Sequence, residues 1–169
     1  LKGKTITFSA DPLATTRPFI DCQGSGRALS LATETSSTII ENIGIRNCVA
    51  DYGGAINAEG NTTAVIRNVM FVNNTATISG GALYVGQAAS PSLSKLSFSG
   101  NRATVGGGSI ALSGVSVQIS DSTFANDIAS SGGSVFVAGG SSSLNNVSVS
   151  GSQAVQGSAV CLNSGTLAL

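Results

Sequence analysis

The stretch FVNNTATISGGALYV, residues 71–85, contains the pattern that decides the fold. It begins with a large apolar anchor, Phe71, which is followed three residues later by Asn74. It ends in Gly80-Gly81-Ala82-Leu83, which leads into alternating apolar residues. The same pattern recurs before and after this stretch. Such self-similarity at a fixed period is the signature of a repeat architecture, so we interpret the chain as an array of one unit.

Six units of about 26 residues align in register when the large apolar residue is taken as the anchor. The anchors are Phe19, Ile45, Phe71, Phe98, Phe124 and Val149. Three residues after each anchor come Cys22, Cys48, Asn74, Asn101, Asp127 and Ser152. Alanine then follows in the last five units, and next comes a glycine step, clearest at Gly53-Gly54, Gly80-Gly81, Gly107-Gly108 and Gly132-Gly133.

The apolar residues of each unit predict three short strands and no helix. After the glycines they alternate, as at Leu83 and Val85, which is the period of a half-buried strand. Before the anchor their spacing is uneven, which predicts two strands separated by a sharp bend. Asparagine or aspartate, which tolerates the left-handed backbone of such a bend, occupies it in four units. These residues are Asn42, Asn68, Asp121 and Asn146.

This unit fits one coil of a parallel β-helix, in which successive coils stack at about 4.8 Å and equal positions form ladders. An antiparallel sandwich also has short strands and glycine-rich turns, but a fixed period with aligned columns favours the helix. We therefore expect residues 1–169 to form a single all-β, parallel β-helix of about six coils. Because the sequence begins without methionine and ends in mid-pattern at Thr166–Leu169, we expect it to be a segment of a longer chain.

Composition excludes several classes of partner. The chain has eight basic and eight acidic residues, and only 9% of it is charged. It therefore lacks the electrostatic basis for binding nucleic acid or an anionic membrane. No apolar run reaches membrane-spanning length, so we expect no membrane insertion by this segment. The neutral, Ser-, Thr-, Asn- and Gly-rich composition is typical of extracellular β-solenoids, whose surfaces can pack laterally with little repulsion.

The three cysteines have different interpretations. Cys22 and Cys48 occupy one column a coil apart, which places their Cα atoms about 5 Å apart, within disulfide reach. A bridge is expected there, although two small buried thiols would also fit a ladder. Cys161 alternates with Val160 and Leu162, so it should face outward as a free thiol or bond to something outside this segment.

Three Asn-x-Ser/Thr sequons occur, and each is a candidate glycosylation site. They begin at Asn61, Asn73 and Asn146. Asn61 follows Gly60 in a loop between expected strands, which makes it the best candidate. Together with the cysteines, the sequons favour a secreted glycoprotein.

The residue types and their spacing give little indication of a catalytic site. The absence of histidine excludes Ser-His-Asp, Cys-His and histidine-metal sites. The acids do not form a pair in one column of adjacent coils, so a hydrolase-type carboxylate pair is not expected. They are Asp11, Asp21, Glu34, Glu41, Asp51, Glu59, Asp121 and Asp127. We expect no enzyme activity, metal or cofactor.

One outward column carries aromatic residues. It reads Ser30, Asn57, Tyr84, Ala111, Phe136 and Cys161. Tyr84 and Phe136 are two coils apart with small Ala111 between them, and exposed aromatics on a low-charge sheet often mark a contact face. Coverage of both rings by a side loop is the alternative.

The repeats resemble those of the polymorphic outer-membrane protein family. Gly53-Gly54-Ala55-Ile56 and Gly80-Gly81-Ala82-Leu83 resemble its GGA(I/L/V) tetrapeptide, and Phe71–Asn74 and Phe98–Asn101 resemble its FxxN partner. The resemblance implies a right-handed, pectin-lyase-like β-helix on a cell surface, and in bacterial members adhesion. Openings such as Phe19–Gly24 resemble those of very large extracellular proteins of algae and protists. The last two units depart from the family pattern, with Ser replacing Ala in the tetrapeptide and Ser152 replacing Asn.

Three functions are compatible with these observations. The first is a structural segment of a surface fibre, cell wall or flagellar appendage filament, whose partners are other subunits or further coils. The second is an adhesin segment that mediates cell attachment, with glycans as possible partners. The third is a carbohydrate-active β-helix enzyme.

Overall fold

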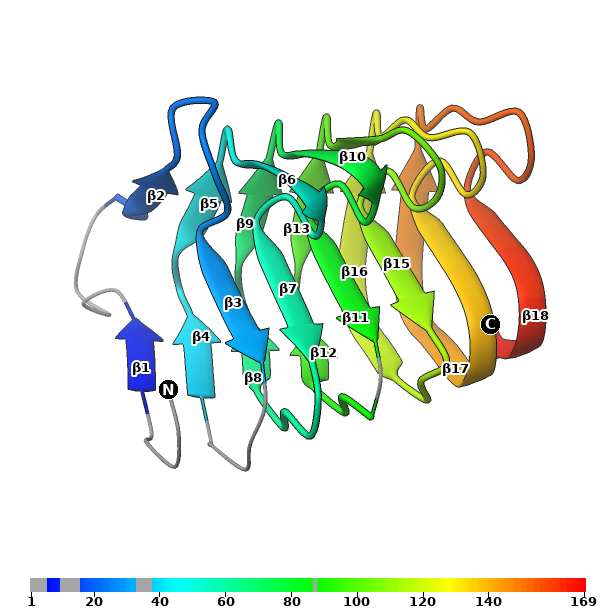
Figure 1. The fold of residues 1–169 in the computed structure, drawn as a ribbon, viewed down its shortest axis with the longest axis horizontal. Coiled ribbons are helices and arrows are strands. Elements are labelled where there is room, and N and C mark those ends of the chain that lie inside the picture. The colour runs from blue at the N-terminus through cyan, green and yellow to red at the C-terminus, as the bar shows by residue number, and fades with distance from the viewer. Residues whose placement is uncertain (1–5, 10–15, 33–37, 87) are drawn as a thin grey trace.

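The computed structural model describes residues 6–9, 16–32, 38–86 and 88–169 as a parallel β-solenoid of about six coils (Figure 1). All strand pairs in these ranges are parallel, and from β2 onward paired residues lie 25–27 positions apart. The predicted fold class, an all-β parallel helix with a repeat of about 26 residues, is therefore confirmed.

The strands form rows along the solenoid axis, most of them within one 15-stranded sheet. The first row contains β3 (Leu29–Ala32), β7 (Ile56–Glu59), β11 (Leu83–Gly86) and β15 (Ile110–Ser113). The second contains β1 (Ile6–Ser9), β4 (Thr38–Glu41), β8 (Val65–Arg67) and β12 (Ser92–Ser94). The third contains β2 (Phe19–Asp21), β5 (Gly44–Arg46), β9 (Met70–Val72) and β13 (Ser97–Ser99).

Toward the C-terminus the rows merge into longer strands. These are β16 (Gln118–Ala125), β17 (Val135–Ser150) and β18 (Val160–Ala168). A separate three-stranded sheet, which the sequence analysis did not predict, contains β6 (Val49–Tyr52), β10 (Thr75–Ser79) and β14 (Arg102–Ala103). It forms at the alanine column, where Ala76 pairs with Ala50 on one side and Ala103 on the other.

The expected bends have left-handed backbone. Asn42, Asn68, Asp121 and Asn146 have φ between 50° and 59°, and Lys95 occupies the same column with φ of 54°. A second left-handed column, which we did not predict, follows the third row. It contains Asn47, Asn73, Gly100, Asn126 and Gly151.

The two glycines of each corner meet different requirements. Gly80 has a φ of 69°, which favours glycine because it has no Cβ. A Cβ on Gly81 would lie 2.0 Å from the carbonyl oxygen of Gly108 in the next coil. A Cβ on Gly54 would lie 2.3 Å from the carbonyl oxygen of Gly81, and a Cβ on Gly108 would lie 2.1 Å from the carbonyl oxygen of Gly133. The second glycine is therefore required by coil stacking.

The core is a set of ladders inside the coils. Phe71, Phe98 and Phe124 are almost fully buried, with ring centroids 4.9 and 4.7 Å apart and nearly parallel planes. Aromatic and aliphatic side chains of adjacent coils thus stack directly on one another. This burial is the main favourable term in folding.

Two alignments made from sequence are wrong. Ile20, not Phe19, pairs with Ile45, while Phe19 is 39% exposed and lies on Gly44, which has no side chain to displace it. Residues 166–168 follow the sixth coil and pair with Ser141–Ser143 in the second row, so the strand expected to open a further coil is present; Leu167, however, aligns with Ser142 and not with Leu144, as its sequence pattern suggests.

Replacing Gly81 by alanine should lower the free energy of unfolding by about 3 kcal/mol or more, because the new methyl group collides with the backbone of the next coil. Denaturant unfolding measures the loss. Ser158→Ala is the matched control, since Ser158 is the exposed equivalent in the sixth coil and should change stability by less than about 0.5 kcal/mol. Equal midpoints for Gly81→Ala and the unmodified protein would contradict the assigned stacking.

Replacing Phe98 by alanine should cost about 3–5 kcal/mol, since the ring is buried between two others. The same change at exposed Phe19 removes its contact with Arg46, whose guanidinium lies 4.9 Å from the ring centroid, and should cost no more than about 1 kcal/mol. Unfolding curves of the two variants distinguish a core ring from a surface ring. A loss below about 1 kcal/mol for Phe98→Ala would show that the register is wrong.

Candidate functional site

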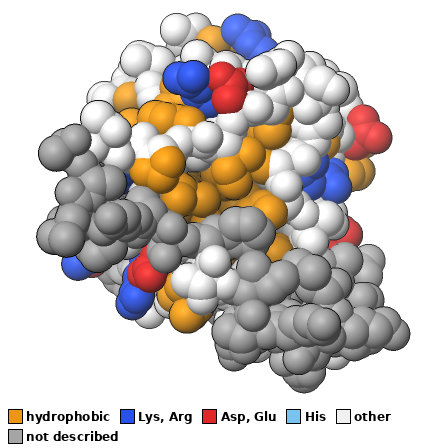
Figure 2. All heavy atoms as spheres, turned by 90° about the vertical axis from the view of Figure 1, so that its left-hand side faces the viewer, with side chains coloured by type: hydrophobic (Ala, Val, Ile, Leu, Met, Phe, Trp, Pro, Cys, Tyr) orange, Lys and Arg blue, Asp and Glu red, His pale blue; other side chains and the backbone are white. Residues whose placement is uncertain are grey.

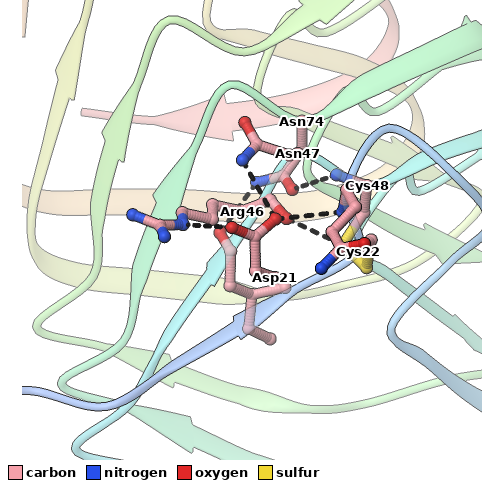
Figure 3. Close-up of polar contacts among 8 residues, drawn as sticks. Asp21, Cys22, Arg46, Asn47, Cys48 and Asn74 are labelled. Carbon is pink, nitrogen blue, oxygen red and sulfur yellow. Dashed lines mark hydrogen bonds and ion pairs between the residues drawn. A yellow bond between two sulfur atoms is a disulfide. The ribbon is translucent and has the colours of Figure 1, made fainter.

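A disulfide joins the first two coils. Cys22 follows β2 and Cys48 follows β5, and their Cα atoms are 4.8 Å apart (Figure 3). The turn after β2 is one residue shorter than the turn after β5, since Ile20 pairs with Ile45. The two cysteines therefore meet although Phe19 is not the anchor.

The carboxylate of Asp21 lies beside this disulfide at the centre of a polar cluster (Figure 3). Its Oδ2 forms an ion pair with Nε of Arg46 at 2.8 Å. Its Oδ1 accepts hydrogen bonds from the Asn47 amide at 3.0 Å and the Gln23 backbone N–H at 2.9 Å. The Gln23 N–H first, and then the Asn47 amide, lower the pKa of Asp21 below its ordinary value. Because three donors already occupy its oxygens, Asp21 is a structural acceptor rather than a free base.

A buried polar ladder runs next to the core. Asn74 and Asn101 are fully buried, and the Asn101 Oδ1 accepts from the backbone N–H and the amide of Asn74, at 3.0 and 3.1 Å. Each amide also donates to a backbone carbonyl of the preceding coil, that of Ile45 or Phe71, at 3.1 Å. This is the turn-bonding role typical of buried asparagine. Asp127, also fully buried, continues the ladder.

Polar side chains on the outside of the coils form hydrogen bonds and ion pairs mainly along the solenoid axis. Glu41 pairs with Arg67, Asp121 accepts from Asn146, and Asn42 accepts from Asn68. In each pair the partners lie 25 or 26 residues apart, one coil from each other. Their functional groups are therefore distributed along the solenoid and do not converge on one point.

The acids form no compact site in the described part of the chain. Asp11 and Glu34 lie outside the described residues. Within those ranges, no three His, Cys, Asp or Glu side chains are close enough to hold a metal ion. Two shallow hollows of about 430 and 290 Å³ lie along the second row, share Gln118, and are lined by uncharged residues, half of them serines.

The outward aromatic column has the predicted register. Tyr84 pairs with Asn57 and Ala111, and Phe136 pairs with Ala111 and Cys161. Both rings are half-buried. Tyr84 packs against Tyr52 with centroids 4.9 Å apart, and Phe136 lies over Gly106. The rings are thus partly covered from β6 and the Gly106 turn, and their role as a contact face stays a prediction. Cys161 is half-buried and forms no disulfide.

The three sequon asparagines are all exposed. Asn61 stands in the loop between β7 and β8. Asn73 lies over Gly100, and the Asn146 amide nitrogen donates to Asp121 at 2.7 Å. The Asn146 amide nitrogen thus already has a protein partner, and Asn61 remains the leading candidate. Glycan occupancy stays a prediction.

These features define a class of protein: a parallel β-solenoid whose polar and apolar side chains form axial ladders. Two segments, residues 68–86 and 95–113, match the family model of the Chlamydia polymorphic membrane protein repeat. They contain Phe71, Asn74 and Gly80–Leu83 in the first match, and Phe98 and Asn101 in the second, whereas Gly53–Ile56 lies outside both. No curated protein and no solved structure is significantly similar to the chain. No helix in the described ranges has the length and apolarity to cross a membrane.

Replacing both Cys22 and Cys48 by serine should reduce stability by about 3 kcal/mol, because the bridge closes a loop of 26 residues in the unfolded chain. Hydrogen exchange should show the loss in the first two coils, with the fifth coil unchanged. Cys161→Ser is the control for loss of a cysteine without loss of a bridge. If the first two coils exchange at the same rate in the double variant and in the unmodified protein, the disulfide does not stabilise them.

Proposed function

We propose that this chain is a non-catalytic structural segment of an extracellular or cell-surface protein. In this proposal it is a rigid β-solenoid that assembles with other subunits or with further coils, as part of a fibre, cell wall or filamentous appendage. The axial arrangement of the side-chain contacts carries the proposal. Catalytic sites need groups of different roles to converge around a reacting atom, whereas most of the side-chain contacts here connect like positions of successive coils.

The cell-surface location has two independent supports. The repeats matched at 68–86 and 95–113 are named after a membrane protein of Chlamydia. The Cys22–Cys48 disulfide is a bond that persists in oxidising surroundings outside the cytosol. Glycosylation at the exposed sequons would belong to the same environment.

The composition of the aromatic column supports the proposal that the chain assembles through it. Tyr84 and Phe136 present apolar surface on a chain that is 9% charged, so neighbouring copies would meet with little electrostatic repulsion. Aromatic side chains are enriched at protein interfaces because they bury a large area with few rotatable bonds.

Replacing Tyr84 and Phe136 by serine should weaken self-association by at least about tenfold, the effect expected of an aromatic contact residue. Serine already occupies this column at Ser30, so the backbone accommodates it. Sedimentation velocity over a range of concentrations measures the association, and circular dichroism checks the fold. Val155→Ser, which removes an apolar side chain that is 88% exposed outside this column, is the control. Unchanged association in the double variant would eliminate this contact face.

An adhesin that mediates cell attachment is the second candidate, favoured by the repeat match. Gly80, Gly81, Ala82 and Leu83 are buried, so in this candidate the tetrapeptide shapes the coil and exposed neighbours such as Thr77 contact the receptor or glycan. Cell-binding assays with a Thr77 variant, whose fold should be intact, are therefore more informative than changes to the glycines. Attachment to cells without self-association would favour the adhesin.

A further inference from the structure

Asp127 has a carboxyl group at a position where the two preceding coils have asparagine. It is fully buried between Asn101 of the fourth coil and Ser152 of the sixth. Its Oδ1 accepts from the Asn101 backbone N–H at 2.9 Å and from the Asn101 amide at 3.3 Å. Its Oδ2 lies 3.4 Å from the Ser134 hydroxyl. The residue thus belongs to the interface between three successive coils.

Aspartate differs from the asparagines of this ladder in one respect. Asn74 and Asn101 both donate a hydrogen bond to a backbone carbonyl of the preceding coil. An ionised carboxylate can only accept, whereas a protonated carboxyl has one O–H donor. A single proton therefore restores to Asp127 the donor that every Asn of the ladder has.

The surroundings favour the neutral form. The groups bonded to Asp127 come from four positions, Asn101, Ser109, Ser134 and Ser152, and none of these side chains is charged or titratable. Burial raises the pKa of Asp127 from its ordinary value of 3.8 to about 6, and the hydrogen bonds from Ser109 and Asn101 only partly oppose this effect. A buried charge without a cationic partner is unfavourable.

We propose that Asp127 is a pH-sensitive lock between the fourth, fifth and sixth coils: it takes up a proton in mildly acidic surroundings and thereby tightens their stacking. The native state binds the proton more strongly than the unfolded chain, so its contribution is fully present below about pH 3.8 and is lost as the pH rises through about 6. Above that pH the contribution no longer changes. The lock concerns coil stacking and is independent of the proposed assembly role.

The test compares the unmodified protein with Asp127→Asn by urea unfolding between pH 4 and 8. Asparagine has the donor at every pH. The ratio of the two folding constants should therefore change about 60-fold in favour of Asp127→Asn between pH 4 and 7.5, which is the linkage expected for a pKa of 3.8 in the unfolded chain and about 6 in the native protein. Asp121→Asn, at the exposed carboxylate of the same coil, is the matched control and should not reproduce this change. Parallel pH profiles for the unmodified protein and Asp127→Asn would overturn the proposal.

A second measurement does not depend on a variant. The carboxyl carbon resonance of Asp127 in the isotope-labelled native protein should titrate with a midpoint near pH 6. A midpoint at or below pH 4 would overturn the proposal, because the native carboxyl would then bind its proton no more tightly than the unfolded one.

Discussion

The close contact between the glycine corner of one coil and the backbone of the next is the constraint on which the rest of the structure depends. At Gly54, Gly81 and Gly108 the carbonyl oxygen of the following coil occupies the space where a side chain would begin. The coils can approach this closely only if the corners coincide, so each coil must keep nearly the same length. Equivalent positions of successive coils are then neighbours along the axis. The phenylalanine stack and the asparagine ladder are consequences of this equal coil length.

The same equal spacing is the basis of the proposed structural role. A side chain in a ladder has its own equivalent as its nearest polar neighbour, as Asn42 has Asn68 and Asp121 has Asn146. Such pairs stabilise stacking but do not bring an acid, a base and a nucleophile to one place. Positions where one coil differs from its neighbours are therefore the candidates for a specific role. Asp127 brings a titratable group into the ladder, and Tyr84 and Phe136 bring rings to a column of small side chains.

Much of this arrangement could be predicted from the sequence, because glycine pairs and large apolar residues recur at one period and that period determines which residues meet. The register of the first coil could not be predicted, because Phe19 resembles an anchor residue. Only the structure shows that the turn between Ile20 and Cys22 is one residue shorter than the same turn in the second coil. The sheet at Ala50, Ala76 and Ala103 was missed because its strands have only two to five residues, which is too short to show a distinct periodicity. The burial of Asp127 could have been predicted, because it occupies the same position of the repeat as Asn74 and Asn101.

Cross-linking between coils measures this register most directly. Ser97 and Thr123 pair on adjacent coils with their hydroxyl oxygens 3.4 Å apart, whereas Ser148 continues the same column one coil further. In a Cys161→Ser background, cysteines at positions 97 and 123 should form a disulfide under mild oxidation, because adjacent coils bring their Cα atoms within bonding range. Cysteines at positions 97 and 148 should remain free thiols. A bridge between 97 and 148, or none between 97 and 123, would contradict the stacking of coils described above.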